Sequence, residues 1–96
     1  QSFARTVRRE IESEKKYPLA AQRSGIQGRV GVSMVILKDG QLEKVEIVES
    51  SGNGMLDNAA LQSVRRAVPF PPLPKKAGRD RIQMSIYIVF KITQHL

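Results

Sequence analysis

The chain has 96 residues, a formal net charge of +7, and neither cysteine nor tryptophan. A chain of this length buries only about 60–65% of its unfolded surface, so it has room for one modest core and for no second domain. Without cysteine it cannot contain a disulfide, a thiolate zinc site or a thiol nucleophile. We therefore expect residues 1–96 to form a single domain without an enclosed active-site cavity.

The positive charge is concentrated at the two ends of the chain. Residues 1–24 carry six basic and three acidic side chains, and residues 71–96 carry five and one. Such clusters are typical of a solvated surface, a nucleic-acid footprint or a patch that attracts an acidic partner. No stretch approaches the roughly 18–20 apolar residues of a membrane-spanning helix. The chain begins at Gln1 without a signal-type apolar region, which predicts a fragment or a processed product.

The first predicted element is a helix over residues 2–15. Phe3, Val7 and Ile11 recur at intervals of four residues and form a narrow apolar stripe among charged positions. We expect this helix to pack through that thin seam, and the remaining core to lie within residues 17–93.

A short helix is predicted over residues 18–24. Tyr17 precedes Pro18, and proline disfavours the helical conformation of the residue before it while fitting the first turn of a new helix. Gly25 is placed to end this helix, because glycine is the usual residue just beyond a helix C-terminus.

Two strands joined by a tight turn come next. Apolar side chains alternate over residues 29–38 and again over 41–49, and Asp39-Gly40 is a favoured two-residue hairpin turn. The turn sets a register that places these residues opposite one another: Lys38 and Gln41, Val32 and Ile47, Met34 and Val45. The second face of this hairpin is only partly polar, which predicts partial cover or a partner there.

A second long helix follows the turn cluster at residues 50–54, with Asn53 as its N-cap. Its apolar stripe consists of Leu56, Ala60, Val64 and Ala67. Asp57 lies in the first turn and two arginines lie in the last, as the helix dipole favours. Four prolines within residues 69–74 then end the helix, and we interpret this segment as a stiff connector that returns to the sheet.

The most regular alternation in the chain covers residues 82–93. Its apolar positions are Ile82, Met84, Ile86, Ile88, Phe90 and Ile92. This pattern predicts a long strand with one buried face. Because antiparallel pairing is commoner and a parallel crossover must obey a handedness rule, we expect this strand to join the free side of the first strand.

The predicted fold is therefore an α+β domain with elements in the order ααββαβ, a three-stranded antiparallel sheet of order 2-1-3, and helices packed on one face. This order leaves the longest strand at an edge, which proteins usually blunt with charge, proline or a bulge. Within residues 82–93, the only charged residue is Lys91, and there is no proline. Either the N-terminal helix or the C-terminal tail covers the edge, or the edge accepts a strand from a partner or a second copy.

Several short motifs, in their order and spacing, resemble the C-terminal domain family of TonB proteins. They span residues 17–92 and are Tyr17-Pro18, Ala20 or Ala21, Gly25-Ile26-Gln27-Gly28-Arg29-Val30, Asp39-Gly40, residues 45–51, Leu56-Asp57-Asn58-Ala59-Ala60, Val64-Arg65-Arg66 and Phe90-Lys91-Ile92. The resemblance implies a periplasmic domain whose Gram-negative parent protein is anchored in the inner membrane. It also implies an ExbB-ExbD-type proton-driven motor upstream, and outer-membrane transporters for iron chelates, haem or cobalamin as partners.

The resemblance further implies two partner surfaces. In the family, a transporter segment called the TonB box adds as a strand beside the final strand, and pulling on it remodels the transporter's plug. The matching residues here are Arg81, Ile82, Gln83, Met84, Ser85, Ile86, Tyr87, Ile88, Val89, Phe90, Lys91, Ile92 and Thr93. A secondary surface corresponds to Lys15, Lys16, Tyr17, Pro18 and Arg23. A strand-exchanged homodimer is a further expectation for the same edge.

The chain departs from the best-known family pattern at three places. A basic residue often found just after the proline is replaced by Leu19 or Ala20, with Arg23 the nearest candidate. Lys15 and Lys16 stand where a Gln-Pro pair commonly precedes Tyr-Pro, and Ala67-Val68 replaces the usual aromatic residue after the second helix's arginines. These departures leave the range of transporters open.

The sequence offers little for an enzyme. His95 is the only histidine, which excludes a His-based triad and a two-histidine metal site. The acidic sets fit a solvated helix and alternating strand positions better than a glycosidase pair; they are Glu10, Glu12 and Glu14, and Glu43, Glu46 and Glu49. The 50–54 loop lacks the glycine spacing and lysine of a P-loop. We expect no catalytic residue, metal or cofactor.

Two alternatives remain open. A TolA-like periplasmic linker matches less well, because Tyr17-Pro18 and residues 25–30 fit TonB better. A nucleic-acid-binding module would use Arg5, Arg8, Arg9, Lys75, Lys76 and Arg79. The five aromatic residues lack the paired stacking pattern of single-strand binders, so no nucleic acid is expected as a partner.

Overall fold

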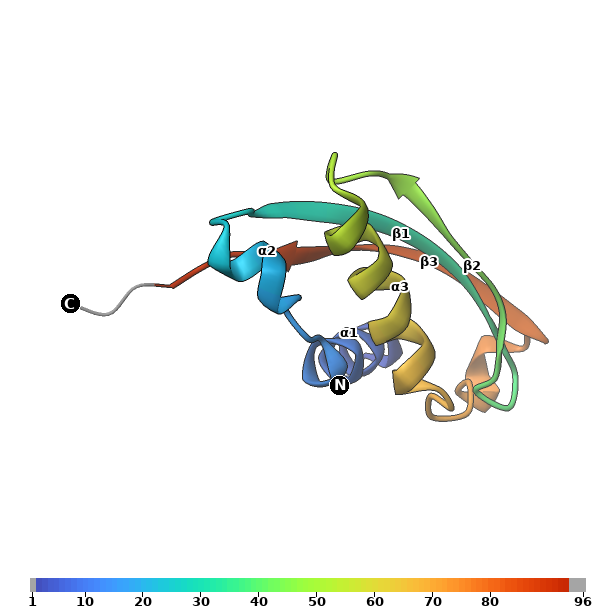
Figure 1. Ribbon diagram of the computed structural model, residues 1–96. Coiled ribbons are helices and arrows are strands. Elements are labelled where there is room, and N and C mark those ends of the chain that lie inside the picture. The colour runs from blue at the N-terminus through green and yellow to red at the C-terminus, as the bar shows by residue number, and fades with distance from the viewer. Residues whose placement is uncertain (1, 94–96) are drawn as a thin grey trace.

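The computed structural model describes residues 2–93, in which three strands form one sheet and the helices cover one of its faces (Figure 1). The helices are α1 (Phe3–Glu14), α2 (Leu19–Arg23), α3 (Gly54–Ala67) and the short 3-10 helix η1 (Lys75–Ala77). The strands are β1 (Gly28–Leu37), β2 (Leu42–Glu49) and β3 (Arg81–Phe90). The sheet order is β2-β1-β3 with both pairs antiparallel, so the predicted fold class is confirmed.

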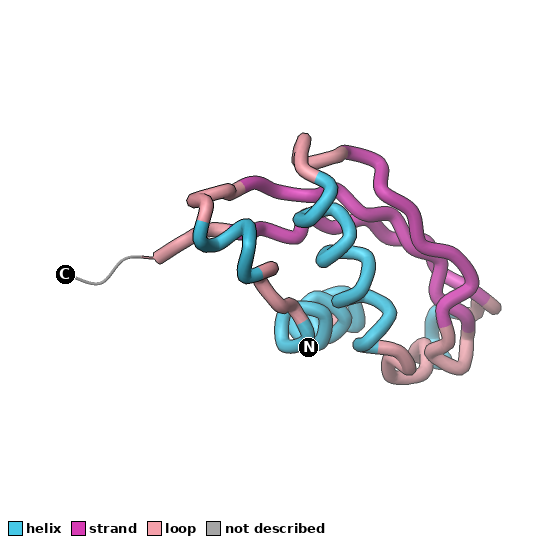
Figure 2. The backbone as a smooth tube through the Cα atoms, viewed as in Figure 1, coloured by secondary structure: helices cyan, strands magenta, loops and turns pink. Residues whose placement is uncertain are grey.

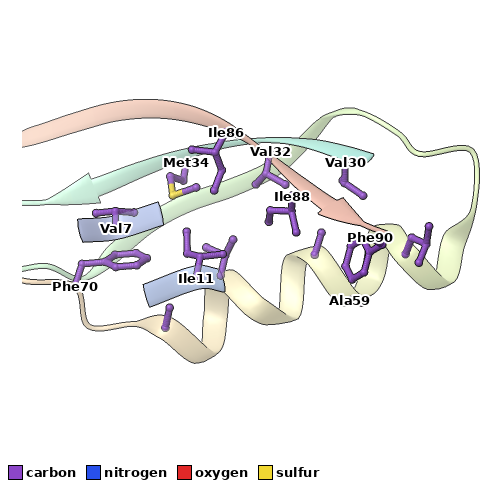
Figure 3. Close-up of a cluster of buried hydrophobic side chains, with 14 of the residues drawn as sticks. Val7, Ile11, Val30, Val32, Met34, Ala59, Phe70, Ile86, Ile88 and Phe90 are labelled. Carbon is purple, nitrogen blue, oxygen red and sulfur yellow. The ribbon is translucent and has the colours of Figure 1, made fainter. Parts of the chain in front are cut away.

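The core lies between the sheet and the helices α1 and α3 (Figure 3). Its buried side chains include Val30, Val32, Met34 and Ile36 of β1, Ile86, Ile88 and Phe90 of β3, Val7 and Ile11 of α1, Leu56, Ala60 and Val64 of α3, and Phe70 and Leu73 of the segment after α3. Burying a valine, leucine, isoleucine, phenylalanine or methionine side chain contributes about 1.5–3 kcal/mol. The narrow stripe of α1 is thus used as predicted, through Val7 and Ile11.

The hairpin turn is longer than predicted. The N–H of Leu37 donates to the carbonyl of Gln41 at 2.7 Å, and the N–H of Gly40 donates to that of Leu37 at 2.9 Å. The loop therefore comprises Lys38, Asp39 and Gly40, and the predicted pairing of Lys38 with Gln41 is wrong. A two-residue type I′ turn needs positive φ at both central residues, whereas here Gly40 has φ +91° and Asp39 does not have positive φ.

Contacts with the proline-rich segment after α3 explain why the turn is longer than predicted. The N–H of Phe70 donates to the carbonyl of Gly40 at 2.9 Å, and the N–H of Leu73 donates to that of Lys38 at 3.0 Å. The segment lies so close that a Cβ on Gly40 would come within 1.9 Å of the Phe70 carbonyl oxygen. A register shift between Val35 and Ile36 then restores the predicted cross-strand partners, Val32 with Ile47 and Met34 with Val45.

The loop before α3 is organised by two side chains. Asn53 caps the helix as predicted, accepting from the N–H of Met55 at 2.9 Å. Asp57 accepts hydrogen bonds from the hydroxyl of Ser50 and from the N–H and hydroxyl of Ser51. Burial alone would raise the pKa of Asp57, but these three hydrogen bonds outweigh it and lower the pKa.

The final strand ends earlier than predicted, at Phe90 instead of Thr93. Phe90 pairs with Gly28, the first residue of β1, so no partner strand remains beyond it. The N–H of Ile92 instead donates to the side-chain oxygen of Gln27 at 2.7 Å. Within the described residues, no helix has the length and apolar character needed to cross a membrane.

Candidate functional site

The outer edge of β3 is the side of the sheet that carries unpaired backbone groups. Residues of an antiparallel strand alternate between pointing their N–H and C=O at the neighbouring strand and pointing them away. The carbonyl of Asp80 accepts from Lys38 and the N–H of Ile92 donates to Gln27, so even-numbered residues face β1. The outward groups therefore belong to the odd-numbered residues Arg81, Gln83, Ser85, Tyr87 and Val89.

One of these outward groups has a partner within residues 2–93. The ammonium of Lys15 donates to the carbonyl of Val89 at 2.6 Å, and it also lies 3.0 Å from a carboxylate oxygen of Glu12 and 5.6 Å from the ring centroid of Phe90. Lys15 thus closes the end of the edge nearest the C-terminus. From Arg81 to Tyr87, no hydrogen bond from a described residue reaches the outward backbone groups.

The side chains of β3 divide between the two faces of the sheet. Ile86, Ile88 and Phe90 belong to the core and their backbone groups face β1, so these three predicted partner-binding residues offer the outer edge neither a side chain nor a free backbone group. Tyr87 and Val89 are 43% and 46% exposed on the face that the helices leave bare. Lys91, Ile92 and Thr93 lie beyond the end of the strand, and the structure does not bring them onto the paired edge.

Tyr87 belongs to a cluster with Arg29 and Glu49 that ties the three strands together. Its hydroxyl donates to Glu49 Oε1 at 2.9 Å, its ring lies 4.3 Å from the guanidinium carbon of Arg29, and Arg29 Nε lies 3.5 Å from Glu49 Oε2. The hydrogen bond to Glu49 and the charge of that carboxylate raise the pKa of Tyr87, against a smaller opposing effect of Arg29. Sequence reasoning missed this cluster.

A signal for the cluster was present in Gly31, a glycine inside a strand. A Cβ there would come within 2.9 Å of Glu49 Cβ and 3.3 Å of Tyr87 Cε1. Glycine within a strand often marks a place where another group approaches the backbone closely, and here that group is the Tyr87 ring together with the Glu49 stem.

The predicted secondary surface is only partly brought together. The Tyr17 hydroxyl donates to the carbonyl of Ile26, and its ring packs edge-on against Phe90 with centroids 5.5 Å apart. Tyr17 and Lys15 therefore meet the end of β3. Lys16 and Arg23 are exposed, and Pro18 is half-buried as the N-cap residue of α2.

Most of the acidic residues considered above for a glycosidase pair form ion pairs with basic side chains. Glu43 pairs with Arg81 at 2.8 Å, Glu46 with Lys44 at 3.5 Å, and Glu12 with Lys15. Among residues 2–93, no group of three His, Cys, Asp or Glu side chains could hold a metal ion. His95 lies outside the described residues.

Sequence comparison with known proteins identifies the family to which this chain is similar. A family model described as the C-terminal part of the Gram-negative bacterial TonB protein matches residues 13–92. The TonB protein of Pasteurella multocida is 38% identical over 92 residues, which cover 96% of this chain and 35% of that protein. The chain thus spans about a third of the length of this relative.

Solved structures agree with the sequence comparison. The TonB C-terminal domain of Helicobacter pylori, residues 179–285 by its own description, superposes with a TM-score of 0.82 at 29% identity, covering 97% of this chain and 83% of that one. TolAIII bound to a peptide from the N-terminus of TolB has a TM-score of 0.70 at 21% identity, covering 94% and 73%, and shares the fold alone. The chain belongs to the family of TonB C-terminal domains.

Proposed function

We propose that this domain couples an inner-membrane, proton-driven motor to outer-membrane TonB-dependent transporters by accepting the transporter's TonB box as a fourth strand beside β3. The observation that carries the proposal is the row of outward backbone groups from Arg81 to Tyr87, which no described residue occupies. An open edge of this kind is a template for strand addition.

The strength of such a contact follows from the number of free groups. Residues 81, 83, 85 and 87 each offer one N–H and one C=O, which makes eight groups in total. At about 0.5–1.5 kcal/mol net per hydrogen bond, full pairing contributes about 4–12 kcal/mol. Association costs about 4–15 kcal/mol, so strand addition alone gives weak and reversible binding.

Side chains beside the edge supply the rest of the affinity. Tyr87 and Val89 are exposed on the bare face of the sheet, next to the position an added strand would occupy. Cross-strand pairs of this type contribute about 0.2–1 kcal/mol each. The secondary surface of Lys15, Lys16, Tyr17, Pro18 and Arg23 adjoins the same end of β3 through Lys15 and Tyr17, and would contact other parts of the transporter.

The arrangement suits the transmission of a pull. β3 pairs with β1 along its whole length, from Arg81 opposite Leu37 to Phe90 opposite Gly28. A load on an added strand would therefore pass from β3 into the central strand, which β2 supports on its other side. A periplasmic location, an inner-membrane anchor and an ExbB-ExbD-type motor belong to the same proposal, and a second copy of the chain could occupy the edge when no transporter does.

The test is a titration of the ¹⁵N-labelled domain with a synthetic TonB-box peptide. We expect backbone amide shifts at Arg81, Gln83, Ser85 and Tyr87. Ser85→Pro removes one outward N–H and leaves the β1 ladder intact, and should weaken binding at least tenfold, whereas Ser85→Ala, which keeps the N–H, should bind like the wild type. A folded Ser85→Pro domain that binds the peptide with unchanged affinity would contradict the proposal.

A further inference from the structure

Two adjoining surface pockets lie at the end of the molecule opposite Tyr17, and the proposed function does not use them. The hairpin turn, the proline-rich segment and the loop around η1 gather there (Figure 2). The pockets have volumes of about 410 and 610 Å³ and share the lining residues Lys38, Leu73, Lys75 and Asp80. We refer to both together as the hairpin pocket.

The walls of the hairpin pocket are held by main-chain hydrogen bonds. The N–H of Lys38 donates to the carbonyl of Asp80 at 2.8 Å, and the N–H of Leu73 donates to the carbonyl of Lys38 at 3.0 Å. Leu73 is 6% exposed and anchors its segment in the core, and the flanking prolines have restricted backbones. A ligand would therefore meet a largely formed site and lose little affinity to ordering it.

Basic side chains outnumber acidic ones around the hairpin pocket. Lys38, Lys75 and Arg79 line it and Lys76 lies beside them, against the two carboxylates of Asp39 and Asp80. Within the described residues, none of these four cations forms an ion pair or a side-chain hydrogen bond, whereas the neighbouring Arg81 is paired with Glu43. The Asp39 carboxylate is already used by the turn, where it accepts from the N–H of Gln41 at 3.1 Å.

Between the charged groups the lining is apolar. It is formed by Leu37, Pro72, Leu73 and Pro74. Unpaired cations around an apolar floor fit a ligand that carries carboxylates beside apolar side chains. A lipid surface fits less well, because anionic headgroups would repel Asp39 and Asp80, which line the pocket.

We propose that the hairpin pocket is a second peptide-binding site, which takes an acidic segment with adjacent apolar residues from a partner protein. Asp80, which lines both pockets, directly precedes Arg81, where the open edge of β3 begins. One partner could therefore occupy the edge and the pocket together. The pocket does not require this, because its lining is complete without an added strand.

The probe is a blocked peptide of sequence Leu-Asp-Glu-Leu, with Leu-Asn-Gln-Leu as its neutral isostere, titrated into the ¹⁵N-labelled domain at 150 mM salt. Neither peptide contains a TonB box, and shifts at Lys38, Leu73 and Asp80 without shifts at Ser85 and Tyr87 distinguish binding in the pocket from strand addition at the edge. We expect saturable amide shifts at Lys38, Leu73 and Asp80 with the acidic peptide and at least fivefold weaker binding of the neutral one. Equal binding of the two peptides, or no saturable shift, would overturn the proposal.

Charge variants locate the site. Lys75→Gln with Arg79→Gln should weaken the acidic peptide at least fivefold, whereas Arg9→Gln with Arg65→Gln, which removes the same charge from exposed helix positions, should change it less than twofold. An equal loss in both double variants would mean attraction by net charge alone and would refute the site. Inorganic phosphate that reproduces the same shifts, or sedimentation with phosphatidylglycerol vesicles that depends on Lys75 and Arg79 without peptide binding, would also refute it.

Discussion

Replacing Lys15 with methionine tests how the open edge of β3 is limited. The ammonium of Lys15 donates to the Val89 carbonyl at 2.6 Å and pairs with Glu12, while its stem lies beside the Phe90 ring. Methionine preserves most of the apolar stem and removes the charge and the three donors. The variant therefore leaves the packing largely unchanged and frees the Val89 carbonyl.

The expected change in the free energy of unfolding follows from these contacts. A hydrogen bond from a charged donor contributes about 1.5–3 kcal/mol when shielded and a cation–π contact about 0.5–1 kcal/mol at an exposed site. The Lys15 side chain is 24% exposed, so solvent weakens both, and the ion pair with Glu12 adds only about 0–1 kcal/mol. We expect Lys15→Met to lower the free energy of unfolding by about 1–2 kcal/mol.

The effect on partner binding has the opposite sign. The freed carbonyl of Val89 can accept one more hydrogen bond from an added strand that extends that far, which contributes about 0.5–1.5 kcal/mol. This corresponds to an affinity for the TonB-box peptide about 2- to 13-fold higher. Urea unfolding measures the first quantity and isothermal titration calorimetry the second, with the exposed neighbour Lys16→Met as the control.

Two results would refute this reasoning. A Lys15→Met domain as stable as the wild type would mean that the bond to Val89 contributes nothing in solution. A variant that binds the peptide more weakly, while Lys16→Met does not, would mean that Lys15 contacts the partner directly and does not limit the edge.

Two further predictions concern stability. Gly40→Ala should destabilise the domain by at least about 2 kcal/mol more than Gly52→Ala, as measured by urea unfolding. Both glycines have φ near +90°, but only at Gly40 would a Cβ meet the Phe70 carbonyl. Similar losses of stability in the two variants would show that the proline-rich segment moves aside easily. Asp57→Asn should cost about 1 kcal/mol at pH 7 by weakening the Ser50 and Ser51 contacts. The pKa of Asp57 is lowered from 3.8 in the fold, so its stabilisation is present above pH 3.8 and is lost as the pH falls below it. The gap between wild type and variant should therefore narrow in that range, and a gap that stays constant down to pH 2 would contradict the assignment.

The hairpin illustrates where prediction from sequence stopped. Asp39-Gly40 correctly marked the turn, and alternation correctly placed Val32 opposite Ile47. The number of loop residues depends on Phe70 and Leu73, which bond to the turn from about thirty residues further along the chain. Local preference allows either turn type, so the tertiary contact decides between them.

The candidate site shows the same division between features set by local sequence and features set by tertiary contacts. The amino-acid sequence alone determined the element order and the buried face of β3, because periodicity and turn residues are local properties, and the general pairing and handedness rules for sheets then placed β3 at an edge. Tertiary structure alone decided that Lys15 occupies the Val89 carbonyl while the outward backbone groups from Arg81 to Tyr87 stay free, and that the Tyr87 side chain beside this edge is bound to Glu49. Such contacts depend on the three-dimensional positions of side chains 38 or more residues apart, which no local pattern specifies.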